Sequence, residues 1–355
     1  MRVNDTIDVR PGEALEVANL EPYLRERLSG AEGPFAVRQF GGGHANLTYL
    51  IRFGEREFVL RRPPYGPLPK GGHDMQREYR VLSRLWEAFP LAPRAFLLCT
   101  DHAVIGADFV VMERRRGIVI RRRLPELFEV DEAARRRVGE NFIGALAALH
   151  GVDYARVGLG DLGKPIGYLE RQLRGWIDRW AAARTPSFPD ASRLIARLAE
   201  RLPLSGAPAL VHNDFKFDNT IFDSGDPTRL VAILDWDMST VGDPLVDLGN
   251  VISLWLEPGD PPPGATATST SIMPTGLPGF PTRAELVARY AETTGRDCSR
   301  VSWYHAFNVF RYAVIGQQIY ARYVRGQTSD ERFATFDAWV AKLVATGTAL
   351  CDRGI

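Results

Sequence analysis

The most constraining feature of this chain is a pair of polar segments, each beside a short apolar run. Residues 212–219 read His-Asn-Asp-Phe-Lys-Phe-Asp-Asn, and the apolar run 230–233 leads into Leu-Asp-Trp-Asp at 234–237. Asp235 lies sixteen positions after Asn219 in the chain. Short apolar runs bounded by polar residues are typical of buried strands, so the sequence predicts that these polar residues lie on loops at strand ends.

The order and spacing of the polar residues match an arrangement that kinases use for phosphoryl transfer. Asp214 would accept the proton of the reacting hydroxyl, which general-base catalysis requires. Asn219 and Asp235 would supply oxygen ligands of the kind that Mg²⁺ prefers, while phosphates and water fill its other positions. We therefore predict an ATP- and Mg²⁺-dependent small-molecule kinase, in preference to a loop whose aspartate only bonds nearby backbone groups.

Two neighbouring side chains allow more than one interpretation. His212 is expected to be a buried, hydrogen-bonded scaffold residue rather than a proton carrier. Asp237 either adds a carboxylate to a second metal ion, positions the substrate, or is simply solvated.

The first hundred residues or so favour an antiparallel sheet with one packed helix. The strands are rich in β-branched and aromatic residues, and a glycine triplet, Gly41–Gly43, separates the first two. From Asp74 to Phe89 the apolar residues recur at helical spacing, with Asp74 as the N-cap and Pro90 ending the run. The five strands are predicted at residues 36–40, 47–53, 57–61, 95–99 and 109–112.

The rest of the chain is predicted to be mostly helical. A hinge at residues 113–117 would join a nucleotide-binding lobe, 1–113, to a larger lobe, 114–355, that carries the catalytic loop and the acceptor site. The fold class is therefore α+β with two lobes. Residues 257–281 hold seven prolines and form a long loop, either a linker or a substrate lid. Helices are predicted around residues 138–149, 168–184, 303–314 and 333–343.

Composition and charge exclude several partners without selecting a function. The chain has 355 residues, of which 45% are hydrophobic and 25% charged, and its net charge is +1. This balance creates no field that would recruit nucleic acid or an anionic membrane. No apolar run is long enough to span a bilayer, and the N-terminus has no apolar signal region. Three widely spaced cysteines suggest free thiols, so we expect a cytoplasmic protein.

Three segments together resemble the aminoglycoside phosphotransferase and choline kinase superfamily. They are residues 212–219, residues 234–237, and the element Val-Gly-Asp-Pro-Leu-Val-Asp-Leu-Gly at 241–249. The resemblance spans about residues 33–255. It implies a protein-kinase-like fold, with ATP or, less commonly, GTP as phosphoryl donor and Mg²⁺ as cofactor.

Other residues make the chain similar to one subgroup, the kinase domains fused to or encoded beside acyl-CoA dehydrogenases. These residues are Lys216 and the segments 40–49 and 60–64. The similarity implies a hydroxyacyl acceptor, such as a hydroxyacyl-CoA, and a functional association with an acyl-CoA dehydrogenase. It also implies that Lys216 faces the transferred phosphoryl group. Asp243 and Asp247 would cap a helix and fix the catalytic loop.

The nucleotide side departs from the usual pattern. Kinases of this shape hold the α- and β-phosphates with a lysine on the third strand, paired to a glutamate on the next helix. Here the third strand carries no lysine, so Arg61 would fill that role with Glu78 as its partner. Backbone groups of the glycine turn and the hinge, and nearby polar side chains, would complete the site: Gly42, Gly43, Asn46, Thr48, Met112, Glu113 and Arg114.

The acceptor and even catalysis itself have alternatives. Of the arginines in the predicted helices 168–184 and 301–325, six are weighed against Glu170 and Asp178, and this excess favours an anionic, or apolar and anionic, acceptor over a cationic aminoglycoside. A non-catalytic nucleotide-binding scaffold is the alternative of another class, motivated by the missing strand lysine. A protein kinase is disfavoured because Asp-Trp-Asp replaces Asp-Phe-Gly and no Ala-Pro-Glu follows. The six arginines are Arg171, Arg174, Arg179, Arg311, Arg322 and Arg325.

Overall fold

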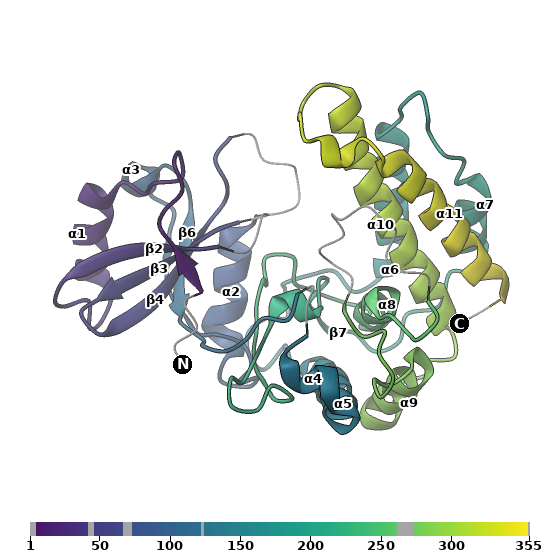
Figure 1. Ribbon diagram of the computed structural model, residues 1–355, viewed down its shortest axis with the longest axis horizontal. Coiled ribbons are helices and arrows are strands. Elements are labelled where there is room, and N and C mark those ends of the chain that lie inside the picture. The colour runs from purple at the N-terminus through teal and green to yellow at the C-terminus, as the bar shows by residue number, and fades with distance from the viewer. Residues whose placement is uncertain (1–4, 42–45, 67–72, 122–123, 261–272, 354–355) are drawn as a thin grey trace.

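The computed structural model of the chain forms two lobes, a sheet lobe from the N-terminal part and a helical lobe from the rest (Figure 1). It describes residues 5–41, 46–66, 73–121, 124–260 and 273–353. The predicted α+β, kinase-like fold class is confirmed. The exact division between residues 113 and 114 stays a prediction.

The sheet lobe is built on one antiparallel sheet of six strands in the order β1-β2-β3-β4-β6-β5. All five predicted strands are present. The sixth, β1, is only two residues long, too short to leave a periodic signal in the sequence. The bounds are β1 Thr6–Ile7, β2 Phe35–Phe40, β3 Leu47–Phe53, β4 Arg56–Arg62, β5 Ala95–Cys99 and β6 Phe109–Glu113.

Helices cover both faces of this sheet, where the sequence predicted one helix. Alternate residues of a strand point to opposite faces. Leu60 accordingly packs with α1 (Val17–Arg27), and its neighbour Val59 packs with α2 (Met75–Leu85). The predicted helix is α2, and the Asp74 side chain accepts a hydrogen bond from the Arg77 N–H at 2.9 Å, as an N-cap does.

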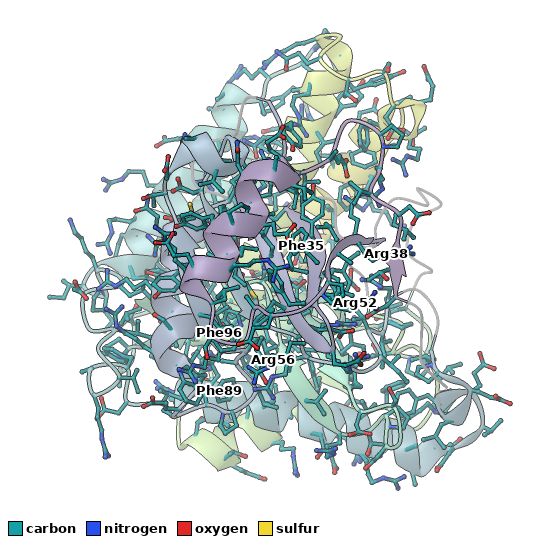
Figure 2. All side chains as sticks on the ribbon, turned by 90° about the vertical axis from the view of Figure 1, so that its left-hand side faces the viewer. Phe35, Arg38, Arg52, Arg56, Phe89 and Phe96 are labelled. Carbon is teal, nitrogen blue, oxygen red and sulfur yellow. The ribbon has the colours of Figure 1, made fainter. Side chains whose placement is uncertain are left out.

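Two helices of this lobe were missing from the sequence prediction. One is α1, which contains Pro22, a residue that normally argues against a helix interior. The other is α3 (His102–Ile105), a single turn. Figure 2 looks onto the α1 side of the lobe, where Arg52 of β3 and Arg56 of β4 lie on the adjoining strands.

Two small two-stranded antiparallel sheets in the helical lobe carry the polar segments. Strand β7 (Ala209–Val211) pairs with β10 (Thr240–Gly242), and β8 (Thr220–Phe222) pairs with β9 (Leu230–Ile233). The four predicted helices correspond to α5, α6, α10 and α11, whereas α4, α7, α8 and α9 were not predicted. The helix bounds are α4 Glu126–Val130, α5 Glu132–His150, α6 Tyr168–Ala182, α7 Ser192–Glu200, α8 Leu245–Leu254, α9 Arg283–Thr294, α10 Val301–Val324 and α11 Phe336–Arg353, with 3₁₀ turns η1 Phe217–Asn219 and η2 Glu331–Phe333.

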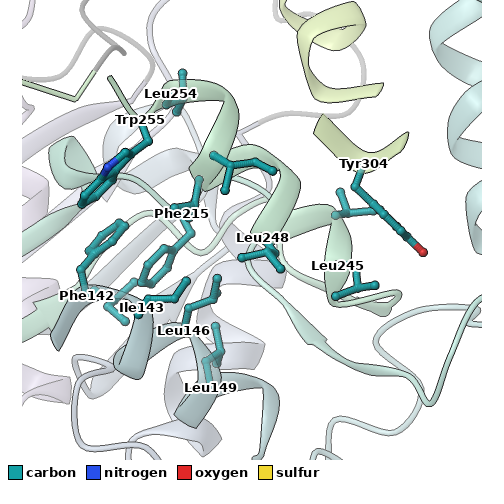
Figure 3. Close-up of a cluster of buried hydrophobic side chains, with 14 of the residues drawn as sticks. Phe142, Ile143, Leu146, Leu149, Phe215, Leu245, Leu248, Leu254, Trp255 and Tyr304 are labelled. Atoms are coloured by element: carbon teal, nitrogen blue, oxygen red, sulfur yellow. The ribbon is translucent and has the colours of Figure 1, made fainter. Parts of the chain in front are cut away.

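Aromatic side chains join the segment 212–219 to the core of this lobe. The ring centroid of Phe142, on α5, lies 4.6 Å from that of Phe215 and 4.7 Å from that of Phe217. Trp255 closes the cluster, with its ring 5.8 Å from Phe217 (Figure 3). Such pairs add to the free energy gained by burial, so the segment around residue 215 is firmly anchored.

The proline-rich segment 257–281 is attached to the helical lobe at both described ends. Arg283, at the start of α9, forms ion pairs with Glu257 and Asp260. The Thr275 hydroxyl donates to the Leu256 carbonyl at 2.9 Å and accepts from the Leu256 N–H at 2.8 Å. Residues 261–272 lie outside the described residues, so the choice between linker and lid stays open. Within the described residues, none of the helices combines the length and apolar character of a membrane span.

His305, near the start of α10, makes the stability of the fold depend on pH. Its side chain is buried and its Nδ1 has no hydrogen-bond partner among the described residues. Burial, reinforced by the charge of Arg283, lowers its pKa to about 3. In the unfolded chain a histidine takes up a proton near pH 6.5. Acid therefore favours the unfolded state, and the stability present above pH 6.5 is lost as the pH falls.

We expect His305→Gln to flatten the dependence of stability on pH between 6.5 and 4.5. One proton taken up only by the unfolded chain corresponds to a slope of about 1.4 kcal/mol per pH unit. Urea titrations at several pH values measure the free energy of unfolding. The control is His102→Gln, because His102 is exposed and hydrogen-bonded to Asp108. Equal slopes for wild type and His305→Gln would contradict this explanation.

Candidate active site

The loop between β7 and β8 presents Asp214 and Lys216 on one side and two phenylalanines on the other. Phe215 and Phe217 are fully buried in the aromatic cluster (Figure 3 shows Phe215). Side chains alternate along an extended segment, so Asp214 and Lys216 point away from that cluster. The alternation does not extend back to His212, which is also buried, because Asn213 has a left-handed φ of 69°.

Three of the predicted catalytic and metal-binding residues meet at this loop. The Lys216 Nζ lies 2.9 Å from the Asp214 Oδ2, and the Asn219 amide donates to the same oxygen at 2.8 Å. The Asn219 amide also donates to the Asp214 carbonyl at 2.9 Å. Burial opposes the charge of Lys216, but the Asp214 carboxylate outweighs it and raises the lysine pKa. The two side chains therefore form a charged pair at neutral pH.

A fully buried carboxylate, Asp247 on α8, fixes the backbone just before this pair. Its two oxygens accept the N–H groups of His212 and Asn213, each at 2.7 Å. The His150 Nε2 lies 3.2 Å from one of these oxygens. Burial disfavours the charged carboxylate, but these hydrogen bonds lower the pKa of Asp247 overall. A charge buried in this way is stable only because its donors are in place.

His212 links the catalytic loop to the second polar segment. Its Nε2 lies 3.0 Å from the Leu234 carbonyl, and its Nδ1 accepts the Asp214 N–H at 3.2 Å. Only a neutral ring with its proton on Nε2 can make both bonds. Burial lowers the pKa of this histidine, in keeping with the neutral form. His212 thus bonds the backbone at Asp214 and at Leu234, and so fixes the position of the first polar segment relative to the second.

Asp243 occupies the start of α8 and connects it to α10. Its Oδ1 accepts the Leu245 N–H at 3.0 Å, and its Oδ2 accepts the hydroxyl of Tyr304 at 2.8 Å. The sequence had grouped Asp243 with Asp247 as helix caps and loop anchors. In the structure Asp243 bonds the helix end and Asp247 bonds the loop.

We expect Asp247→Asn to destabilise the protein by about 1–3 kcal/mol, the cost of leaving a buried donor without a partner. An amide has a single acceptor oxygen, so its NH₂ group would face one of the two backbone N–H groups that now meet the carboxylate. Urea unfolding measures the loss. Asp178→Asn, on the exposed side of α6, is the matched control. A loss no larger than that of the control would show that the network is dispensable.

On the other side of the site, an arginine of the sheet lobe joins the second polar segment. Arg61, on β4, donates from Nη2 to the Asp235 Oδ1 at 2.8 Å and from Nη1 to the Glu78 Oε1 at 2.5 Å. Asp235 has a left-handed φ of 68°. Burial opposes its charge, yet Arg61 lowers its pKa to about 2. Glu78 is completely buried, and this burial raises its pKa to about 7.

This arrangement places Arg61 where the sequence predicted it, beside the helix glutamate. Thr48 lies opposite Arg61 in the register of β3 and β4. The Arg61 Nε and the Glu78 Oε2 have no hydrogen-bond partner among the described residues. Buried polar atoms without partners are rare, and each one calls for an explanation such as a water molecule, an ion or a ligand group.

Asp237 is held by the sheet lobe rather than solvated. Its Oδ2 accepts the Asn46 amide at 3.1 Å and the His73 N–H at 3.1 Å. The His73 Nδ1 lies 2.7 Å from the Asn46 Oδ1, which closes the triangle. Burial, and then the charge of Asp235, raise the pKa of Asp237 to about 6. The sequence prediction missed His73, because no local pattern connects it to a residue 164 positions away.

The predicted hinge residues lie at the end of β6, where the lobes meet. Met112 is buried in the sheet, and the Glu113 N–H donates to the Arg94 carbonyl at 2.8 Å, so this donor is already used. The Arg114 guanidinium lies 4.7 Å from the Phe40 ring centroid and pairs with Asp5. Gly42 and Gly43 lie outside the described residues.

The oxygen donors of this site fit magnesium. Asn219, Asp235 and Asp237 offer one amide and two carboxylates, and Mg²⁺ binds few protein oxygens while taking the rest from water and phosphate. In the described part of the chain, no group of three or more His, Cys, Asp or Glu residues is arranged to hold a metal ion on its own. A closed structural metal site is therefore not seen there.

Two cavities of the structure lie away from these residues. One, of about 660 Å³, lies between α7 and α11 and is lined by residues such as Arg193 and Thr348. The other, of about 320 Å³, lies in the sheet lobe beside Val9 and Phe35. Neither cavity is lined by a predicted site residue.

Comparison with known proteins agrees with this geometry. The family model described as the phosphotransferase enzyme family matches residues 36–286. Acyl-CoA dehydrogenase family member 11 of Rattus norvegicus is 32% identical over 361 residues, which covers 98% of this chain and 45% of that protein. Member 10 of Mus musculus is 33% identical over 329 residues, which covers 92% of this chain and 30% of that protein. The chain thus spans less than half the length of these relatives.

Solved structures of similar fold agree with the family match. A Ralstonia eutropha protein, provisionally assigned as an aminoglycoside phosphotransferase, superposes with a TM-score of 0.79 at 30% identity, covering 96% of this chain and 99% of its own. Aminoglycoside phosphotransferase APH(4)-Ia in complex with AMP-PNP and hygromycin B gives 0.56 at 16% identity, covering 95% and 100%. Similarity at the latter level shows the fold alone.

Proposed function

Because the chain belongs to the phosphotransferase enzyme family, we propose that it moves the γ-phosphoryl group of ATP to a hydroxyl of a small molecule. The observation that carries the proposal is the meeting of Asp214, Lys216 and Asn219 on one anchored loop. Phosphoryl transfer depends mainly on positioning and charge stabilisation, and a rigid loop of this composition supplies both.

Asp214 is the proposed base. Its Oδ2 receives bonds from Lys216 and Asn219, which hold the carboxylate in one orientation while an acceptor hydroxyl approaches. The proton of that hydroxyl would pass to the carboxylate as the oxygen attacks phosphorus. Lys216 would at the same time offer positive charge to the transferred phosphoryl group.

Asn219, Asp235 and Asp237 are the proposed magnesium ligands. The bound metal would neutralise phosphate charge, and these residues would hold it near the loop. Arg61, with Glu78 behind it, is the proposed counterpart of the usual strand lysine and would bind the α- and β-phosphates. In the structure Arg61 also bonds Asp235, so in this proposal one guanidinium would serve both the phosphates and that carboxylate.

The remaining sequence predictions belong to the nucleotide side of the proposal. Backbone groups of Gly42, Gly43, Met112, Glu113 and Arg114, and the side chains of Asn46 and Thr48, would contact the nucleotide. At the hinge, the Glu113 N–H already donates to the Arg94 carbonyl, so a hydrogen bond from the hinge to the nucleotide would come from another backbone group. GTP is retained as an alternative donor, since a neighbour of the same fold, aminoglycoside 2'-phosphotransferase-IIIa, is known with GDP bound.

A hydroxyacyl compound, free or as its CoA thioester, is the proposed acceptor. Its support is the similarity to acyl-CoA dehydrogenase family members 10 and 11 over nearly the whole chain. An aminoglycoside is the second candidate, favoured by the neighbour that holds hygromycin B. We also propose a functional association with an acyl-CoA dehydrogenase. A cytoplasmic location fits the three free cysteines, since thiols persist in reducing compartments.

Nucleotide consumption with Mg²⁺ across an acceptor panel tests this proposal. The panel comprises hydroxyacyl-CoAs, free hydroxy acids, aminoglycosides and choline-type alcohols, each supplied with ATP or GTP, and mass spectrometry identifies the product. Phosphorylation of a hydroxyacyl compound supports the proposal. Activity confined to aminoglycosides would instead identify an aminoglycoside as the acceptor. Binding of Mg-ATP without any phosphorylated product, and without slow hydrolysis, would indicate a non-catalytic scaffold.

A further inference from the structure

One of the six arginines that favoured an anionic acceptor differs from the others in its surroundings. Arg171 and Arg325 bond backbone carbonyls at the surface, and Arg174 and Arg322 are exposed. Arg179 is also exposed, and its guanidinium lies over the Trp176 ring, 4.5 Å from the centroid. Arg311, in the middle of α10, is only 7% exposed. A buried guanidinium has lost its hydration, so its charge needs compensation from its surroundings.

The surroundings of Arg311 compensate that charge only in part. Its Nη1 donates to the Asn308 side chain at 2.7 Å and its Nη2 to the Asn213 carbonyl at 3.3 Å. Both acceptors are neutral. No ion pair of Arg311 with a carboxylate occurs in the described parts of the chain, and its Nε has no hydrogen-bond partner there. Buried charges are usually paired, so the missing partner points to a ligand.

Nearby hydroxyl groups do not supply the missing charge. Tyr168, whose hydroxyl donates to the Asn213 side chain at 3.2 Å, is fully buried, and this burial raises its pKa despite the opposing charge of Arg311. Burial likewise raises the pKa of Tyr312, the next residue on α10. Both phenols are therefore neutral at physiological pH, and neither acts as a counterion.

A second buried donor without a partner lies against Arg311. The guanidinium is stacked over the Trp176 ring, 5.3 Å from its centroid, and the Trp176 Nε1 has no hydrogen-bond partner among the described residues. Trp176 is itself nine-tenths buried. An indole N–H is normally bonded when buried. Two orphan donors on touching side chains, one of them charged, have the chemistry of a small anion site.

The position of this pair relates it to the reaction. Arg311 bonds the carbonyl of Asn213, the residue directly before the proposed base. Ile315, one turn further along α10 and on the same side, is 37% exposed. A ligand lying along this side of α10 would meet an apolar surface, then Arg311, and then Asp214.

We propose that Arg311, with the Trp176 N–H beside it, binds an anionic group of the acceptor and so orients its hydroxyl toward Asp214. The inference rests on the proposed function and narrows its substrate class to hydroxy compounds with a carboxylate or phosphate. The carboxylate of a free hydroxy acid and the phosphates of CoA share this chemistry. A neutral hydroxy compound lacks it.

Paired probes test the proposal, with binding measured by calorimetry in the presence of Mg-AMP-PNP and transfer measured with Mg-ATP. Each straight-chain hydroxy acid is compared with its primary amide, and each hydroxyacyl-CoA with the hydroxyacyl-pantetheine that lacks the CoA phosphates. The wild type is expected to bind the anionic member of one pair roughly 10- to 100-fold more tightly, the effect of one charged hydrogen bond. The pair that shows the preference identifies the source of the anion.

Variants assign the preference to the residues. Arg311→Gln is expected to bring the ratio of the two affinities near one, and Arg311→Lys to keep part of it. Trp176→Phe, which removes the indole N–H but keeps an aromatic ring, is expected to lower the ratio several-fold. Arg322→Gln, exposed on the same helix, is the control and should leave the ratio unchanged. The ratio is taken within each variant, so a general loss of stability or rate does not affect it.

Each outcome separates the two proposals. A wild type that binds both members of every pair equally, or a preference that survives in Arg311→Gln, overturns the anion site even if transfer occurs. A preference that depends on Arg311 but comes without phosphorylated product supports the site and removes the kinase proposal. Failure of the wild type to bind any probe overturns both the anion site and the hydroxyacyl acceptor.

Discussion

Asp214→Asn is expected to lower kcat by about 10²- to 10⁴-fold, the contribution of a general base, while leaving the protein folded. The substitution replaces one carboxylate oxygen by an amide nitrogen of similar size, and the asparagine oxygen can still accept from Lys216 and the Asn219 amide. What it cannot do is take a proton from the acceptor hydroxyl. The loss should therefore appear in kcat, with little change in the KM for ATP.

Steady-state kinetics with the best acceptor of the panel measure this effect, and urea unfolding confirms that the variant is folded. Asp178→Asn on α6 provides the control for a surface aspartate, with no expected change in kcat. A variant that retains more than a tenth of the wild-type kcat would remove Asp214 from the mechanism. The remaining activity would then have to come from positioning alone.

Arg61→Met is expected to cost about 3–5 kcal/mol of stability, because it leaves Glu78 and Asp235 without their shared cation in a buried site. Nucleotide binding should weaken in the same variant, with at least a tenfold rise in the KM for ATP, since a charged hydrogen bond to phosphate is lost. Arg61→Lys should recover part of both properties. Its single ammonium cannot bond both carboxylates in the forked geometry of the arginine.

A double-mutant cycle separates the structural part of this effect from the functional part. Glu78→Gln in the Arg61→Met background removes the uncompensated buried carboxyl, so stability should return in part while the KM for ATP stays high. Stability comes from urea unfolding and KM from the kinase assay. Unchanged stability in Arg61→Met, or full recovery of both properties in the double variant, would contradict the role given to Arg61.

The extent of successful prediction followed the length and regularity of each element. All five long strands and α2 were found from their periodicity, and Asp74 was recognised as a cap from its residue type. Several of the missed elements were short or irregular: β1 has two residues, α3 is one turn, and α1 contains Pro22. A helix start was expected at Asp243, but the extent of α8 was not predicted, because the helix is buried on nearly all sides and this weakens the amphipathic signal.

For the site residues, too, the contacts that could be predicted were those between residues close together in the sequence. Asp214, Lys216 and Asn219 lie within one short loop, so their spacing in the sequence nearly fixes their spacing in space. The partners that come from the other lobe carry no such signal. Asn46 lies 191 positions from Asp237, and Arg61 lies 174 positions from Asp235.

The sequence alone therefore determined the residue types of the site, the local structure on which they lie, and the α+β fold class, because these depend on short-range periodicity and turn chemistry. Only the tertiary structure decided which donors meet which carboxylates. It placed Arg61 on Asp235, closed Asn46 and His73 around Asp237, and buried Arg311 beside Trp176 with no ion-paired carboxylate in the described part of the chain. Such contacts depend on packing between distant elements, and so do the burial and charge that shift each pKa.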